Sequence, residues 1–357
     1  MPSLCRGTLV ILGLLALLVG AVILRLLVGP SLSSFTPETA EQVLHIRWHR
    51  AMIALVVGAC LGAAGVVLQS LLRNPLASPD VLGPSSGASF AVMLATFVSS
   101  KYMLDASTTA SSSIAPGFGG LIWQAGPAMI GATLALALVY ALSQRRGRVD
   151  SDGLIIVGVI VSVVCGAGVV FIQHLINASA ISGRTLTLLV GSISDDTPAA
   201  FVHAAGVVAL VTITLIALTL GRSMDAANLS DDEAYSVGVR LPFLRFALFI
   251  SAGLLTAAAV VLAGPIGFVG LICPHLVRLM IGPSGSLSAR LTLEPFLGRA
   301  GVLLIASTLC GSTLLILADT GVRAIDLGSG RMPVGVLTAL LGGPSLIVLL
   351  RRSRRSD

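Results

Sequence analysis

The sequence predicts an all-α integral membrane protein with about ten transmembrane helices and both termini in the cytoplasm. Of its 357 residues, 55% are hydrophobic and only 11% are charged, whereas a soluble domain carries about 25% charged residues. The mean hydropathy is +0.99. Apolar stretches of about 20 residues, the length that spans a bilayer, recur along the whole chain. Most of the protein surface is therefore expected to face lipid.

The spanning elements are predicted to be helices rather than strands of a barrel. Lipid offers no water to backbone groups, so only helices and closed barrels cross it, and barrel strands alternate apolar and polar residues. The runs 9–27 and 207–220 do not alternate. We expect helices at 8–28, 51–71, 82–98, 121–142, 153–175, 199–220, 243–263, 266–281, 300–318 and 333–350, in one transmembrane domain covering 1–357.

The distribution of basic residues sets the predicted orientation. With ten spans and the N-terminus inside, 15 of the 22 Lys and Arg residues fall in cytoplasmic segments and seven in outer segments, as the positive-inside rule requires. The net charge of +6 follows from this bias and does not indicate nucleic-acid binding. The first apolar run is too long for a signal peptide, and no small-residue cleavage site follows it. It is predicted to be a retained helix.

Cysteine and histidine offer no metal site. The five cysteines, at 5, 60, 165, 273 and 310, are spread along the chain without CxxC spacing and are predicted to be packing residues. His275, beside Pro274, has no second ligand at useful spacing, so a structural or interface role is favoured. No catalytic cluster supports an integral membrane enzyme.

A source of energy is missing from the chain. A P-loop requires a lysine in GxxxxGK[ST], and Lys101 is the only lysine in the sequence. The chain is thus predicted not to be an enzyme with its own ATPase site. It would couple either to a separate ATPase or, as a secondary transporter, to an ion gradient through a buried acid. Asp319 is the main candidate acid, but it precedes Arg323 by four residues, and pairing on one helix face is the favoured interpretation.

One cytoplasmic connection, at about 222–245, is predicted to contain a short helix. Ser230 and Glu233 have the spacing of a capping box. This helix could be a surface connector or a docking element for a cytosolic partner.

Three blocks of motifs resemble the permease family of binding-protein-dependent ABC importers for ferric siderophores, haem and cobalamin. The blocks lie in family order over about 300 residues and are together highly specific. They read Arg47-Trp48-His49-Arg50 with Arg73-Asn74-Pro75-Leu76, then Ala263-Gly264-Pro265-Ile266-Gly267 with Pro274-His275 and Arg278, then Ala318-Asp319, Arg323 and Pro333-Val334-Gly335. The chain departs from the family pattern at His49, at Arg331-Met332 and at Pro283-Ser284-Gly285.

The resemblance implies four groups of site residues. Arg47, Arg50 and Arg323, at predicted outer helix ends, would form a cationic surface that docks glutamates of the binding protein, since guanidinium groups pair well with carboxylates. Asn74, Leu76, Ser151 and Asp152 would close a cytoplasmic gate. Asp231, Asp232, Glu233, Ala234 and Gly238 would form the coupling helix. Pro274, His275, Arg278 and Asp319 would be structural motif residues, with Arg278 meeting carbonyls, lipid or the ATPase.

The same resemblance implies the partners and the location. The chain would form a homodimer, or pair with a close paralogue, in the lipid of the bacterial inner membrane. Two ATP-binding subunits, which carry ATP and Mg, would bind inside and a substrate-binding protein outside. No cofactor and no nucleic acid are expected on this chain. Ferric siderophore is the first choice of cargo, haem the second and cobalamin the third.

Overall fold

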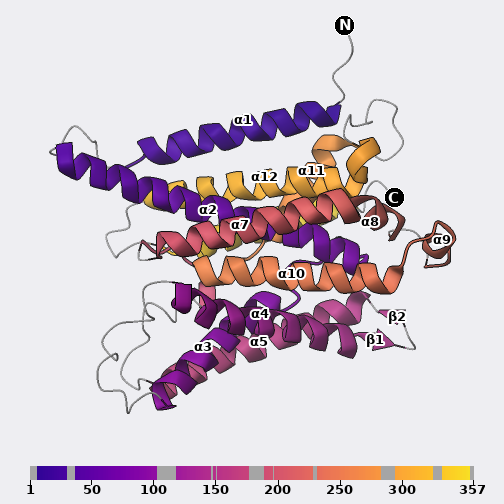
Figure 1. Cartoon of the computed structure of the whole chain (residues 1–357). Helices are drawn as coiled ribbons and strands as arrows, with labels where there is room; N and C mark the ends of the chain where they lie inside the picture. The colour runs from indigo at the N-terminus through magenta and orange to yellow at the C-terminus, as the bar shows by residue number, and fades with distance from the viewer. Residues whose placement is uncertain are drawn as a thin grey trace, which may run out of the picture.

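The computed structural model describes residues 6–29, 37–102, 118–145, 148–149, 151–176, 189–195, 197–227, 231–282, 294–324 and 332–353. These residues form a helical bundle (Figure 1) whose connections include one two-residue hairpin, β1–β2. The elements are α1 (Arg6–Leu27), α2 (Pro37–Leu72), α3 (Pro84–Tyr102), α4 (Phe118–Leu142), β1 (Gln144–Arg145), β2 (Arg148–Val149), α5 (Ser151–Ile176), α7 (Ala199–Leu215), the π-helical turn Ile216–Leu220, α8 (Gly221–Ala227), α9 (Asp231–Ser236), α10 (Leu241–Ala263), α11 (Val269–Ile281), α12 (Glu294–Ala324) and α13 (Val334–Ser353).

Every one of the ten predicted ranges overlaps a helix, which confirms the all-α membrane fold class. Within the described residues, seven helices are long and apolar enough to cross a membrane. Three shorter apolar helices, Pro84–Val98, Val269–Ile281 and Val334–Ser345, account for the remaining ranges. The number of crossings and the cytoplasmic position of the termini stay predictions.

The largest difference from the predicted boundaries is at the start of α2. This helix has 36 residues, about 54 Å at 1.5 Å per residue, against a hydrocarbon core of about 30 Å. It begins at Pro37, whereas the predicted range begins at residue 51. The hydropathy pattern missed the first turns because they contain Glu38 and other polar residues, which such a pattern cannot assign to a span. Figure 1 shows this end of α2 projecting beyond the other helices.

Two other predicted boundaries are wrong for local reasons. Residues 266–268 are not helical, because Phe268 has a left-handed φ of 68° before α11 begins. The helix predicted at 300–318 extends from Glu294 to Ala324, with a kink at Gly298 where φ is 70°.

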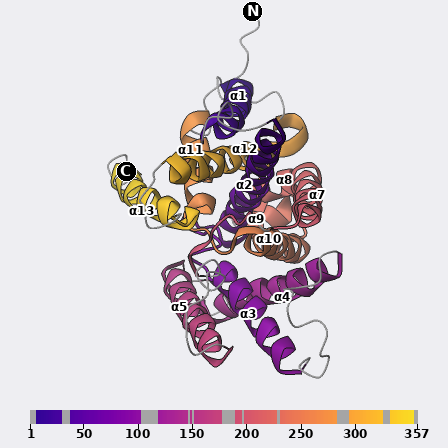
Figure 2. The ribbon, with the colours of Figure 1, turned by 90° about the vertical axis from the view of Figure 1, so that its left-hand side faces the viewer.

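The long helix α2 forms the centre of the bundle. It packs against α12, α10, α11 and α7, and most of its side chains after Arg50 are buried. Figure 2 shows α3, α4 and α5 gathered on one side, with α10 between them and the group around α2. Glycines let the backbones approach closely, as is common between membrane helices.

We predict that Gly65→Ala destabilises the fold, because a methyl group at Gly65 of α2 would overlap the backbone carbonyl of Gly270 in α11. Backbone cannot move aside as a side chain can, so we expect a loss of about 1–3 kcal/mol. Thermal unfolding of the purified protein in detergent measures it. Gly13→Ala in α1 is the matched control, since nothing lies within 4 Å of its added methyl. Equal melting temperatures for the two variants would contradict this close packing.

Candidate functional site

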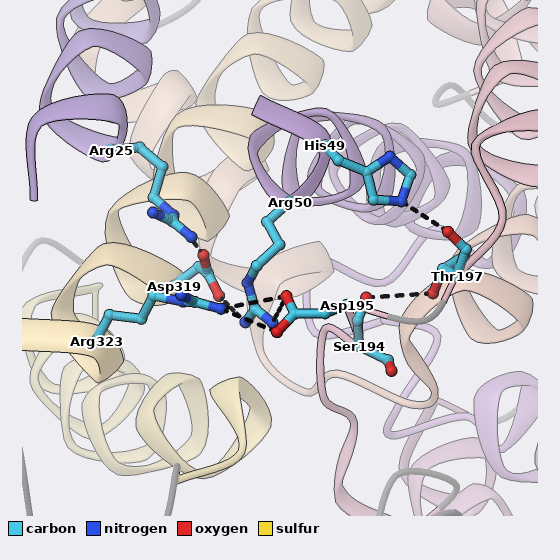
Figure 3. A network of polar contacts seen from close by, with 8 residues as sticks. All are labelled: Arg25, His49, Arg50, Ser194, Asp195, Thr197, Asp319 and Arg323. Atoms are coloured by element: carbon cyan, nitrogen blue, oxygen red, sulfur yellow. Dashed lines mark hydrogen bonds and ion pairs between the residues drawn. The ribbon is translucent and has the colours of Figure 1, made fainter. Parts of the chain in front are cut away.

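A cluster of five charged side chains joins three helices to the segment before α7 (Figure 3). Arg25 of α1 donates from Nε to Asp319 Oδ2 of α12 at 2.7 Å. Arg50 of α2 donates from Nη2 to Asp319 Oδ1 at 2.6 Å and from Nη1 to Asp195 Oδ1 at 2.7 Å. Arg323, one turn after Asp319, donates to the Asp195 carboxylate at 3.2 Å. We call these five residues the charge cluster.

The centre of the charge cluster is buried and its edge is open. The side chains of Asp319 and Arg25 are 0% and 1% exposed, whereas that of Asp195 is 35% exposed. The predicted pairing of Asp319 with Arg323 is wrong. The Asp319 carboxylate bonds Arg25 and Arg50, whereas Arg323 bonds Asp195. Spacing along one helix identifies a possible neighbour but cannot reveal partners on other helices. Arg25 and Asp195 were missed for the same reason.

The three predicted docking arginines differ in how accessible they are. Arg47 and Arg50 are only 4% and 5% exposed. Both lie well inside the extended α2 and not at its end, which corrects their predicted position. Arg47 donates to the carbonyl of Leu26 at 2.7 Å. Arg323, at the end of α12, has a side chain that is 16% exposed. Their role in docking stays a prediction.

The segment that carries Asp195 is fixed at several points. The Ser192 N–H donates to the Ala263 carbonyl at the end of α10, and the Gly335 N–H donates to the Gly191 carbonyl from the start of α13. His49, one of the departures from the family pattern, contacts the Thr197 carbonyl through Nε2 at 2.7 Å. The charge cluster is therefore connected to the interior of α2, to the end of α10 and to the start of α13.

The predicted gate residue Asn74 lies in a tight turn between α2 and α3. Its side-chain Oδ1 accepts from the Leu76 N–H at 2.9 Å, and its carbonyl accepts from Ala77. A residue the sequence did not single out, Asp80, links this turn to the second motif block by accepting from the Phe268 N–H at 3.0 Å. Burial raises the pKa of the Asp80 carboxyl above its ordinary value, against the lowering effect of that hydrogen bond.

Two further gate residues, Ser151 and Asp152, begin α5 directly after the β1–β2 hairpin. The orientation of their side chains lies outside the described part of the structure. The gate role of all four residues stays a prediction.

The predicted short helix is present as α9, at the same end of the bundle as the hairpin (Figure 1). Ala234 is fully buried and anchors α9, while Asp232, Glu233 and Gly238 are exposed. The helix ends at Ser236, and the turn after it contains Gly238, where φ is 85°. Asp231 begins α9, but Ser230, the other half of the predicted capping box with Glu233, lies outside the described residues. The structure adds two exposed apolar side chains, Tyr235 and Val237.

Beside this end of the bundle, His275 of the Pro274-His275 motif lines a cavity. The cavity has a volume of about 570 Å³ and lies where α2 and α11 end and α12 begins. Its polar lining consists of Gln69, Ser70, Asp225, His275, Arg278 and Arg299. Pro274 itself is buried within α11.

These features define a multi-pass helical membrane protein with an ion-paired cluster toward one end and an exposed short helix at the other. The sequence model of the FecCD transport family matches residues 8–352. The chain belongs to this family, and its seven long apolar helices among the described residues fit a multi-pass membrane protein.

Relatives of known role match over nearly the whole chain. The chain is 33% identical to the ferric enterobactin permease protein FepG of Escherichia coli, over 97% of this chain and 94% of that protein. It is 32% identical to the vitamin B12 permease protein BtuC of Vibrio cholerae, over 96% and 94%. It is 30% identical to the hemin permease protein HmuU of Yersinia pestis, over 87% and 83%.

A solved structure shares the fold. It is described as an inward-facing conformation of a metal-chelate type ABC transporter. It aligns with a TM-score of 0.71 and 27% identity, over 97% of this chain and 99% of that chain.

Proposed function

We propose that this chain is the permease subunit of an ATP-driven importer of iron chelates, with ferric siderophore as cargo first and haem next. The observation that carries the proposal is α9, a short helix with exposed Tyr235 and Val237, at the end of the bundle away from the arginine-rich charge cluster. A chain without a P-loop lysine needs such a contact to receive energy from a separate ATPase. A second permease copy and an external binding protein would complete the importer.

The choice of cargo rests on the relatives. Among eight similar permeases, five are named for iron chelates or hemin and three for cobalamin. Their identities to this chain, 30–33%, barely differ. Cobalamin is therefore the alternative cargo, ranked after ferric siderophore and haem.

The test is reconstitution of the chain in proteoliposomes with its ATPase and its binding protein. We expect the ATPase to be stimulated by the binding protein loaded with a ferric siderophore, and less by hemin or cobalamin. If only the binding protein loaded with cobalamin stimulated the ATPase, cobalamin would be the cargo in place of an iron chelate. Uptake without the ATPase, driven by an ion gradient, would reject the importer proposal in favour of a secondary transporter.

We predict that Arg323→Glu weakens docking of the binding protein at least tenfold, since the variant puts a negative charge where a carboxylate would bind. The measurement is the dissociation constant of the binding protein on the reconstituted permease. Arg323 is a better site for this test than Arg50, because Arg50→Glu would also disrupt the buried pair with Asp319. Arg240→Glu makes the same charge change on an exposed residue beside α9. Equal dissociation constants for Arg323→Glu and Arg240→Glu would show that Arg323 does not belong to the docking surface.

A further inference from the structure

The described residues that line the cavity beside α11 carry an excess of positive charge. Two guanidinium groups, Arg278 of α11 and Arg299 of α12, line it together with one carboxylate, Asp225 of α8. Both oxygens of that carboxylate already accept backbone N–H groups, from Arg299 at 2.6 Å and Ala300 at 2.8 Å. With His275 neutral, two arginines and one aspartate leave a net charge of +1 on the lining.

Four buried polar atoms of this lining have no hydrogen-bond partner among the described residues. Arg278 Nη1 is buried and makes no hydrogen bond in the described structure. Gln69, only 4% exposed, has neither its amide nitrogen nor its amide oxygen bonded, and the Ser70 hydroxyl is also unpartnered. Arg299 is held in place, since its Nη2 donates to the Gly282 carbonyl at 2.9 Å. Buried polar groups normally have hydrogen-bond partners, so the three donors among them, Arg278 Nη1, the Gln69 amide nitrogen and the Ser70 hydroxyl, fit an anionic oxygen ligand.

The remaining lining residues are apolar, which indicates that the ligand is amphiphilic. Val66, Leu303 and Leu279 supply apolar walls, and Leu279 is 58% exposed. The cavity lies near the ends of membrane helices, about 29 Å along α2 from Arg50 at the helical rise. Basic pockets between membrane helices suit anionic lipid head groups, and guanidinium groups bind phosphate well. A free phosphate would use the arginines but not the apolar walls.

We propose that this cavity binds the phosphate of an anionic phospholipid through Arg278 and Arg299, with Gln69 and Ser70 completing the hydrogen bonds and an acyl chain lying against Leu279. The site is separate from the charge cluster and from α9. The proposal does not depend on which cargo the protein carries.

The test is native mass spectrometry of the full-length purified protein in detergent, titrated with dioleoyl phosphatidylglycerol or dioleoyl phosphatidylcholine. We expect phosphatidylglycerol to bind at least tenfold more tightly than phosphatidylcholine. Arg278→Gln and Arg299→Gln should each lose about tenfold in that affinity. Arg240→Gln, which removes an exposed arginine outside the cavity, should change nothing. Thermal unfolding checks the fold, and phosphatidylglycerol should raise the melting temperature of the wild-type protein but not of Arg278→Gln.

Three results would overturn the proposal. The first is unchanged phosphatidylglycerol binding in folded Arg278→Gln. The second is competition by inorganic phosphate at millimolar concentration, which would make the cavity a site for free phosphate and not for lipid. The third is a loss of ATPase co-purification in Arg278→Gln while lipid binding is retained, which would assign Arg278 to the contact with that subunit.

Discussion

Replacing Asp319 with asparagine is expected to cost about 3–5 kcal/mol of folding stability, the range for breaking a buried ion pair by removing one partner. Asp319 is the only acid bonded to Arg25 among the described residues, and Arg25 is 1% exposed with Nη1 and Nη2 already unpartnered. An asparagine amide cannot neutralise this guanidinium. The variant should yield far less monodisperse protein, with a lower melting temperature in detergent.

Asp195→Asn is the matched control for this experiment. It makes the same chemical change at the other acid of the charge cluster, but the Asp195 side chain is 35% exposed. Ion pairs that are open to solvent contribute much less than buried ones, so Asp195→Asn should lower the melting temperature much less than Asp319→Asn does. A folded Asp319→Asn protein as stable as Asp195→Asn would show that Asp319 is not the counter-charge of Arg25.

A rescue variant separates the structural role of Asp319 from an ion-coupling role. Arg25→Met in the Asp319→Asn background removes the unpaired charge and should recover much of the lost stability, because apolar residues often replace buried ion pairs without loss. ATP-dependent uptake by this double variant, reconstituted with its partners, would exclude Asp319 as a proton carrier. Restored folding without any uptake would instead favour the secondary-transporter alternative.

Hydropathy predicted the helices well because lipid forces each span to satisfy its own backbone. It failed at the first turns of α2, where Glu38 belongs to a helix that continues beyond the apolar run. The physical reason is that a helix outside the hydrocarbon needs no apolar surface, so its sequence carries no such signal.

The sites were less predictable than the helices. Motif resemblance identified Arg50, Asp319 and Arg323 as important, but not the contacts among them. Arg25 and Asp195, 294 and 145 residues away from their respective partners Asp319 and Arg50, complete the charge cluster only through the packing of α1 and the segment before α7. In the sequence, Gln69 is likewise only one polar residue near a helix end. The packing of α2 against α11 in the structure places it in the lining of the cavity with Arg278.

Replacing Tyr235 with aspartate is expected to reduce ATP-dependent uptake at least thirtyfold, provided that α9 is the coupling helix. Tyr235 is 56% exposed in the isolated chain, and tyrosines at the centre of an interface commonly contribute about 2 kcal/mol or more, a factor of about 30. Burying a new carboxylate against the ATPase adds a desolvation cost. Uptake and ATPase co-purification, measured on the reconstituted complex, should fall together.

The fold should not change in this variant, because an exposed substitution away from caps and buried networks usually alters stability by less than about 0.5 kcal/mol. Tyr235→Phe is the matched control, since it keeps the ring that would fill a cleft of the ATPase and should preserve uptake. Val164→Asp would be a poor control, because this 64% exposed residue belongs to the spanning helix α5. Normal uptake by folded Tyr235→Asp would mean that α9 does not transmit the energy of ATP hydrolysis, and the coupling surface would have to be sought elsewhere on this end of the bundle.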